Sequence, residues 1–535
     1  MLVSGARAYA RGNGYIRNLP SFVSPWSPAS MPSLSICRIK VVHISMLVAT
    51  VSAVLLGTRS GNVSAADRPN VILLMGDDHG WDETGYNGHP HLKTPILDQM
   101  AATGLRLDRF YAAHPTCSPT RGSVITGRHP NRYGTFTPNY SIRPEEIGIA
   151  SLLKQANYHT AHFGKWHLGP VKASSPTNPG AFGFDEWLSH DNFFELNPWL
   201  SHNGGPPEQF QGESSELLVD RAIKYLQTVP SDEPFFLVIW YGSPHEPYSG
   251  LPEDLALYDD LPSQYADQTT RLTSNETGLP VRRPLGEVLR ERYAEITAMD
   301  RSIGTLRQWL TANELRDNTL LWYCGDNGTS GDGIVTSPLR GQKSDLYDGG
   351  IRVPGLIEWP AKISQPTASQ VPSVTTDILP TLCELADVAV PQRPLDGVSL
   401  VPLLNGNMKQ RNQPICFWSF DHRRDSQQDP YLPEEAQQGT TPLVKLMRGT
   451  ATRNFVNFHH PKIEPGDFGG NCVIMDDRYK LVVSADGSKQ LYEMQTDPNE
   501  TENVLASQPD IAQSLTDQLQ TWQQSVLESL TGQDY

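Results

Sequence analysis

Three continuous runs of apolar residues constrain the fold of this chain most strongly. They lack the polar–apolar alternation of a strand with one wet face, and they cover Asn70–Met75, Pro234–Trp240 and Thr319–Tyr323. Strands of this kind are buried on both faces and are typical of parallel sheets. Segments with helical periodicity lie between them, namely Pro95–Thr103, Glu216–Thr228 and Glu287–Ala312. The pattern predicts an α/β fold, with a mostly parallel sheet between layers of helices.

Each apolar run leads into a polar cluster. Asp77 and Asp78 follow the first run, His245 follows the second, and Asp326 with Asn327 follows the third. Because ligands of such sheets bind at the carboxyl ends of the strands, we expect the clusters to converge on one edge. Their oxygen atoms suit Ca²⁺ or Mg²⁺ better than zinc. An Asp-Asp pair alone is often a solvated turn, but close carboxylates at two buried strand ends repel unless a cation joins them.

The C-terminal quarter has a different pattern. The chain has 535 residues, which leaves room for more than one domain of ~150 residues. Beyond residue 405 the apolar runs are shorter and alternate more, as in Cys416–Phe420 and Lys480–Val483, and a helical pattern covers Asp510–Leu530. We therefore expect a large catalytic domain over 66–405 and a smaller α+β domain with an antiparallel sheet over 406–535.

Residues 1–65 form a leader of different composition. They hold six basic residues and no acidic one, and an apolar run over Met46–Gly57 precedes small residues. This is typical of a secretory signal, and the run is shorter than the ~20 residues that span a bilayer. We expect an exported protein, periplasmic or secreted, without stable membrane insertion; a retained anchor is the alternative. Met31 offers a second translation start. The net charge of -16 argues against a nucleic-acid partner.

The segment Cys117-Ser118-Pro119-Thr120-Arg121 is the sharpest motif. Ser118 and Pro119 predict the N-cap and first position of a helix that runs to about Gly127. Cys117 would then lie, partly exposed, at the positive end of the helix dipole, and Arg121 could reach back to it from one turn on. A buried structural thiol is the alternative. The spacing of Cys117 and Arg121 is too short for a protein tyrosine phosphatase.

The number of cysteines is compatible with a role for Cys117 outside a disulfide. Five cysteines follow the leader, and an odd number leaves at least one thiol without a disulfide partner. Cys324 and Cys383 lie in apolar segments, which predicts buried thiols. Cys416 and Cys472 could pair within the smaller domain, and the sequence leaves that pairing open.

The segment from Cys117 to Arg121 resembles the Cys-x-Pro-x-Arg signature of the type I, formylglycine-dependent sulfatases of the alkaline phosphatase superfamily. Further motifs follow the family's order over nearly all of the chain after the leader: Gly164–Gly169, Ser243–His245, Asp326–Gly328, Gly341–Lys343 and Leu491–Glu493. The resemblance implies an alkaline phosphatase-like fold. It also implies that a formylglycine-generating maturation enzyme converts Cys117 to Cα-formylglycine. One Ca²⁺ would be bound by Asp77, Asp78, residue 117, Asp326 and Asn327.

The same resemblance implies roles for the remaining site residues. Lys165 and Lys343 would bind the sulfate oxygens, with Arg121 completing a basic pocket. His245 would protonate the leaving alcohol, and His167 would take a proton from the formylglycine hydrate. Lys165 and His167 are two residues apart, so on an extended segment they face the same side.

We therefore expect hydrolysis of a sulfate ester, with a sulfated carbohydrate as substrate and the alcohol selected by loops at 170–213, 246–285 and 423–470. One alternative is a phosphate or phosphonate ester hydrolase of the same superfamily. The other is a catalytically silent glycan-binding protein, should Cys117 stay unmodified.

Overall fold

A large mixed sheet organises the chain. The computed structural model describes residues 68–423, 428–443 and 452–535, so the expected leader lies outside the described residues. Within them, ten strands form this sheet in the spatial order β13 (Thr367–Ser369), β2 (Leu105–Leu107), β12 (Gly355–Glu358), β11 (Thr319–Gly325), β1 (Asn70–Gly76), β8 (Phe235–Trp240), β4 (His159–Lys165), β5 (Glu186–His190), β6 (Trp199–His202) and β7 (Glu208–Gln209). The five neighbours from β11 to β5 are parallel. The expected mostly parallel sheet is confirmed, and the antiparallel pairs lie toward its edges.

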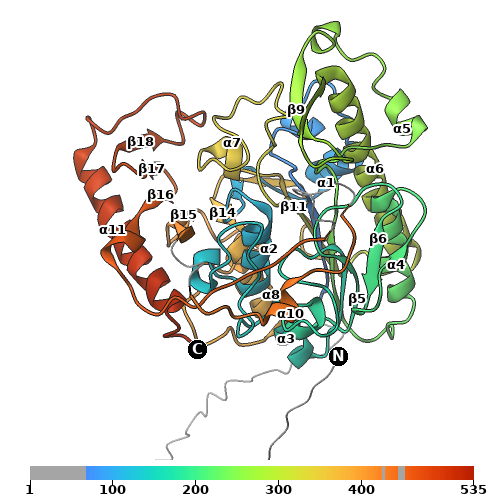
Figure 1. The fold of residues 1–535 in the computed structure, drawn as a ribbon, viewed down its shortest axis with the longest axis horizontal. Coiled ribbons are helices and arrows are strands. Elements are labelled where there is room, and N and C mark those ends of the chain that lie inside the picture. Colours follow the sequence, from blue (N-terminus) through green and yellow to red (C-terminus); the bar gives the residue numbers. More distant parts are fainter. Residues whose placement is uncertain (1–67, 424–427, 444–451) are drawn as a thin grey trace, which may run out of the picture. The chain divides into compact units, whose positions relative to one another are not determined.

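The alternation of side chains along β1 explains why apolar residues fill it without interruption. Val71, Leu73 and Met75 point into one core, which also holds residues of α2 (Cys117–Thr126), α3 (Ile149–Leu153) and α8 (Ile378–Ala386). Ile72 and Leu74 point into a second core with α1 (Pro95–Thr103), α4 (Ser214–Leu226) and α6 (Leu285–Ala312). Each such side chain contributes about 1.5–3 kcal/mol when it is fully buried. Helices therefore cover both faces of the sheet (Figure 1).

The C-terminal region builds a second sheet. It is antiparallel throughout and runs in the order β15 (Ile415–Phe420), β16 (Gly470–Met475), β17 (Tyr479–Val483) and β18 (Lys489–Glu493). The long helix α11 (Pro509–Leu530) shares an apolar core with this sheet, and the two are drawn in orange to red in Figure 1. The expected C-terminal antiparallel sheet is confirmed. The domain boundary near residue 405 stays a prediction.

Smaller elements complete the fold. They are the helices α5 (Pro252–Ala256), α7 (Asp348–Ile351), α9 (Val401–Leu404) and α10 (Glu434–Gln437), and the strand pairs β3 (Phe110–Tyr111) with β14 (Ser373–Val374) and β9 (Thr269–Thr273) with β10 (Pro280–Pro284). Within the described residues, no helix has both the length and the apolar character needed to cross a membrane.

The five cysteines of the described residues are free thiols. Cys324 and Cys383 are buried, as expected. Cys416 lies opposite Ile474 in the second sheet, whereas Cys472 lies opposite Trp418 and accepts a hydrogen bond from Gln523 Nε2 at 3.2 Å. The two thiols are therefore not cross-strand partners.

Candidate functional site

The register of the parallel strands brings the polar clusters together. Gly76, the last residue of β1, is paired with Gly325 of β11, so Asp77 and Asp326 leave neighbouring strands at the same level. The backbone N–H of Asp78 donates to Asp326 Oδ1 at 2.9 Å. Lys165 ends β4 at the same edge, and its Nζ lies 2.5 Å from Asp77 Oδ2. The polar residues that follow these strands therefore lie together at the carboxyl edge of the sheet, as expected.

Helix α2 brings Cys117 to this edge, with a start that differs from the expected one. The helix begins at Cys117 itself and Thr116 is its N-cap, so Ser118 is not the capping residue. The Ser118 hydroxyl instead donates to the carbonyl of His167 at 2.6 Å. This tertiary bond ties the helix to the loop after β4. The helix ends at Gly127, as the sequence predicts, and Gly127 has the left-handed conformation (φ 69°).

Cys117 is buried, and the expectation of partial exposure is wrong. The residue is 1% exposed, and its Sγ lies 3.7 Å from Asp78 Oδ1. Burial raises the pKa of the Cys117 thiol well above its ordinary value, although Lys165 and Lys343 act in the opposite direction. A protonated thiol is a poor nucleophile. The environment is therefore unsuited to a reaction of Cys117 as an ordinary thiolate.

Two lysines neutralise the two aspartates after β1, with opposite results. Lys343 Nζ lies 2.6 Å from Asp78 Oδ1. Burial raises the pKa of Asp78, but the charges of Lys343, His245 and Lys165 together exceed that effect and hold the pKa far below the usual range. For Asp77, burial is the stronger influence and raises the pKa to about 7, against the attraction of Lys165. The site thus holds one firmly ionised carboxylate and one whose ionisation needs more positive charge.

Arg121 joins the carboxylate of Asp326 to the end of β4. Its guanidinium donates to Asp326 Oδ2 from Nη2 at 2.7 Å and from Nε at 3.1 Å, and to the carbonyl of Lys165 from Nη1 at 3.0 Å. Through these hydrogen bonds Arg121 orients the carboxylate of Asp326 and the end of β4. Burial lowers the pKa of Arg121, but the charges of Asp326, Asp77 and Cys117 together raise it, so Cys117 lies within electrostatic range of the guanidinium. The expectation that Arg121 reaches back to residue 117 stays a prediction.

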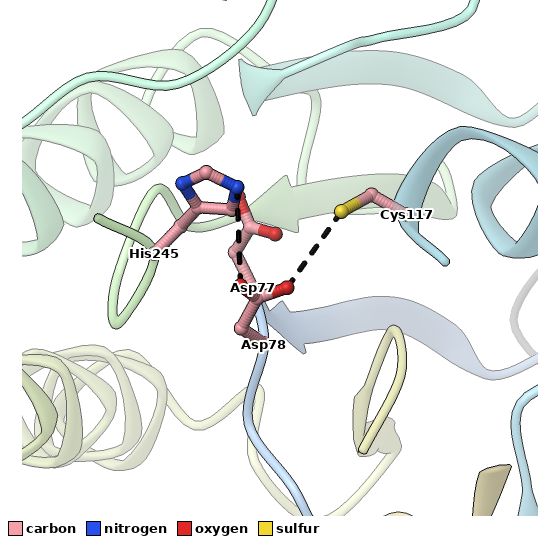
Figure 2. Close-up of side chains that lie close together, drawn as sticks. All are labelled: Asp77, Asp78, Cys117 and His245. Atoms are coloured by element: carbon pink, nitrogen blue, oxygen red, sulfur yellow. Dashed lines mark hydrogen bonds and ion pairs between the residues drawn. The ribbon is translucent and has the colours of Figure 1, made fainter. Parts of the chain in front are cut away.

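The oxygen atoms around Asp78 fit a hard cation. Asp77, Asp78, Cys117 and His245 each offer a ligand atom, and these atoms lie within 4.8 Å of one another (Figure 2). Asp77 Oδ1 and Asn327 Oδ1 are buried and accept no hydrogen bond. Buried oxygens without donors are costly unless a cation or a donor satisfies them. Ca²⁺ takes this set of carboxylate and amide oxygens.

Two histidines flank the same pocket. His245 Nε2 lies 3.8 Å from Asp78 Oδ2, while its Nδ1 donates to the carbonyl of Glu246 at 2.5 Å and fixes the ring. Both ring nitrogens of His167 are buried without a hydrogen-bond partner. His167 has φ 57°, so the segment is not extended there and the expected geometry is wrong. Burial, followed by the charge of Lys165, lowers the pKa of His167 well below its usual value, so the ring is neutral.

A buried ion pair beneath the site has no signal in the sequence. Arg292 on α6 donates from Nη2 to the carbonyl of Asp78 at 2.8 Å and from Nη1 to the carbonyl of Pro244 at 2.7 Å. Glu83 binds the same guanidinium through two contacts of 2.6 Å. Arg292 thus joins the turn after β1 to the loop that carries His245. Helical periodicity marks it only as a buried position.

Comparison with known proteins identifies relatives over most of the chain. The sulfatase family model matches residues 69–388. The N-acetylgalactosamine-6-sulfatase of Mus musculus is 31% identical over 395 residues, which cover 66% of this chain and 69% of that protein. The ulvan-active sulfatase of Formosa agariphila is 31% identical over 345 residues, which cover 63% and 65% of the two chains.

A solved structure has the same architecture. The crystal structure of Ps i-CgsB in complex with k-i-k-neocarrahexaose matches with a TM-score of 0.68 and 23% sequence identity, covering 86% of this chain and 93% of that chain. The likeness confirms the expected alkaline phosphatase-like fold, including its C-terminal antiparallel sheet.

Proposed function

The chain belongs to the sulfatase family of sulfuric ester hydrolases, and from this premise we propose that it is an exported enzyme that desulfates a carbohydrate. We further propose that it uses one Ca²⁺ and a Cα-formylglycine derived from Cys117. The environment of Cys117 is the observation that carries the proposal. Its buried sulfur lies beside Asp78, and Lys165 and Lys343 form ion pairs with Asp77 and Asp78.

The state of Cys117 supports its conversion. Its thiol is held protonated by burial, which disfavours thiolate chemistry and is compatible with a residue that a maturation enzyme oxidises before the site closes. The hydrated aldehyde would supply the hydroxyl that attacks sulfur, and Ca²⁺ would favour ionisation of that hydroxyl. Asp77, Asp78, Asp326, Asn327 and residue 117 would hold the cation, with Arg121 orienting Asp326.

The remaining side chains have distinct tasks in this proposal. Lys165 and Lys343 bind sulfate oxygens and stabilise the charge that develops on them, each contributing about 2.7–4 kcal/mol by analogy with oxyanion-hole donors. His245 would protonate the leaving oxygen from Nε2, which lies 3.8 Å from Asp78 Oδ2, while its Nδ1 donates to the carbonyl of Glu246 and fixes the ring. His167 is neutral and has unpartnered nitrogens, which suits a base that accepts the proton of the second hydroxyl.

The substrate class rests on the relatives. Two of them are named for N-acetylgalactosamine-6-sulfate and for ulvan, and a structural neighbour was solved with neocarrahexaose. The leader over 1–65 supports export, where an enzyme meets polysaccharides.

Peptide mass spectrometry and one substitution test the nucleophile. We expect the peptide that spans Cys117 to be about 18 Da lighter than its unmodified form when the protein is made with the maturation enzyme. We expect Cys117→Ala to fold, with the wild-type thermal unfolding temperature, and to lack sulfatase turnover. Turnover by Cys117→Ala, or by protein that carries only unmodified cysteine, would contradict the formylglycine proposal.

Parallel assays test the leaving group and the reaction class. A sulfate and a phosphate ester of the same alcohol are compared, together with a set of sulfated oligosaccharides. We expect a higher kcat/KM on the sulfate ester, and saccharide turnover with release of inorganic sulfate. A preference for the phosphate ester would favour the phosphatase alternative, and binding of saccharides without sulfate release would favour the silent glycan-binding protein.

A further inference from the structure

Arg453 lies on an extended segment beside the candidate site. The backbone N–H of Gly439 donates to the carbonyl of Arg453 at 2.7 Å, and that of Phe455 donates to the carbonyl of Gln437 at 2.8 Å. A bridge between Gln438 and Asn454 completes this antiparallel pairing. Successive side chains of an extended segment point to opposite faces, so Arg453 and Phe455 share a face. That face is turned toward the site, because the Phe455 ring lies 6.2 Å from the His167 ring.

The guanidinium of Arg453 has no partner among the described residues. Its Nε is buried and forms no hydrogen bond. A carboxylate binds the guanidinium group of six other arginines, namely Arg121, Arg128, Arg132, Arg292, Arg307 and Arg411. Arg109, which is also buried, donates to the carbonyl of Asp477. Leaving a cation desolvated without an anion is unfavourable, so such a group is expected to serve a ligand.

Electrostatic interactions indicate which groups lie near the guanidinium of Arg453. Burial lowers the pKa of Arg453 to about 10, and the neighbouring group that opposes this shift is Cys117. Arg453 in turn helps to lower the pKa of His167, after burial and Lys165. The guanidinium therefore lies within electrostatic range of the nucleophile position and of the candidate base.

We propose that Arg453 binds a second anionic group of the saccharide, a carboxylate or another sulfate, next to the sulfate that is cleaved. Lys165 and Lys343 already supply positive charge for the scissile sulfate, so a further cation suits a neighbouring substituent. The planar fork of arginine matches the two oxygens of a carboxylate or a sulfate in a bidentate pair. This proposal rests on the proposed function and narrows the substrate class to saccharides with more than one negative charge.

Three related substrates test the assignment on the mature enzyme. They are an uncharged disaccharide with one sulfate, the same disaccharide with a uronic acid carboxylate, and a disulfated form. We expect Arg453→Gln to lower kcat/KM by about 10- to 100-fold on the carboxylated or the disulfated substrate, and by less than about threefold on the uncharged one. Arg453→Lys should recover part of the loss. The substrate with the larger loss identifies the anionic group.

Controls separate this inference from a structural effect and from the proposed function. Arg478→Gln removes the same charge from a half-exposed residue whose partner is Glu493, and should change none of the three values. In the inactive Cys117→Ala background, calorimetric titration should show that Arg453→Gln weakens binding of only the doubly charged saccharide. Equal losses on all three substrates, or none, would overturn the assignment of Arg453. Absence of hydrolysis by the wild type on all three would instead contradict the proposed function.

Discussion

Asp77 and Asp78 are neighbours in sequence, yet their surroundings drive their pKa values in opposite directions. Burial raises the pKa of Asp77 to about 7. For Asp78 the charges of Lys343, His245 and Lys165 together exceed the effect of burial and lower the pKa. The difference arises from contacts made by side chains far away in sequence, and it leaves Asp78 as the anion around which the site is arranged. Lys343, Asn327, His245 and Cys117 all lie close to its carboxylate.

Replacement of His245 should reveal whether it protonates the leaving oxygen. Removing a general acid slows a reaction by about 10²–10⁴-fold when the leaving group needs a proton. We expect His245→Ala to lose that much kcat on alkyl and sugar sulfates and little on an activated aryl sulfate, which departs as a stable phenolate. A series of aryl sulfates of graded phenol pKa measures the effect. Equal losses along the series would contradict the acid role; His202→Ala, on an exposed histidine, is the control.

Arg292 should act as a positioning residue. Because it binds the carbonyls of both Asp78 and Pro244, its loss should displace the cation ligands and His245 together. We expect Arg292→Lys to lower kcat about equally on good and poor leaving groups, a profile that His245→Ala does not share. Arg307→Lys is a matched control, since Arg307 lies on the same helix and pairs with Glu358 through two contacts of 2.8 Å. If both variants have the same kcat, Arg292 has only a structural role.

At the scale of elements, the hydrophobic pattern of the sequence predicted the bounds of those helices and strands that depend on local interactions. The helix over Pro95–Thr103 has the bounds that the periodicity indicates, and β1, β8 and β11 match their apolar runs within two residues at each end. The start of α2 could not be predicted, because Ser118 gives its hydroxyl to the loop after β4 instead of capping the helix. The partners of Arg292 and the isolation of Arg453 depend on contacts across the fold, for which a single sequence holds no local signal.

The close packing of β4 against β8 depends on one glycine. Gly164 has φ 99°, and a Cβ there would lie 2.0 Å from the carbonyl oxygen of Trp240 in β8. Gly88 has φ 93° and open space around it, which makes it a matched control for backbone strain alone. We expect Gly88→Ala to cost about 1–2 kcal/mol and Gly164→Ala to cost about 1–3 kcal/mol more. Urea unfolding measures both, and equal costs would contradict a packing role for Gly164.

At the scale of the whole molecule, partly buried polar contacts join α11 to the segment after α2. Asp396 accepts from Trp522 Nε1 at 2.7 Å and is also bound by Arg132. Arg132 in turn donates to the carbonyl of Ser525 at 3.0 Å. His129 completes the contact, with its ring 4.9 Å from that of Trp522 at an angle of 87°. The C-terminal helix thus packs against the segment that directly follows the helix of Cys117.

His129 should make this contact sensitive to acid. Burial lowers the pKa of its imidazole to about 3, against the attraction of Asp396, whereas the unfolded chain takes up this proton below its ordinary value of 6.5. The unfolded state therefore binds more protons between those two values, and stability falls as the pH falls through this window. Between pH 7 and pH 5 the loss from this one group amounts to about 2 kcal/mol.

Substitution isolates that contribution from the other buried histidines. The backbone N–H of Asn131 donates to His129 Nδ1 at 3.3 Å. The substitution His129→Asn keeps an acceptor for this N–H and removes the titrating imidazole. We expect His129→Asn to be less stable than the wild type at pH 7, because a packed ring is lost, and the gap in unfolding free energy to narrow by about 2 kcal/mol at pH 5. Parallel curves would show that His129 keeps an ordinary pKa in the folded protein. If the difference in unfolding free energy narrows, the contact between His129 and α11 is one of the places where acid destabilises the folded protein.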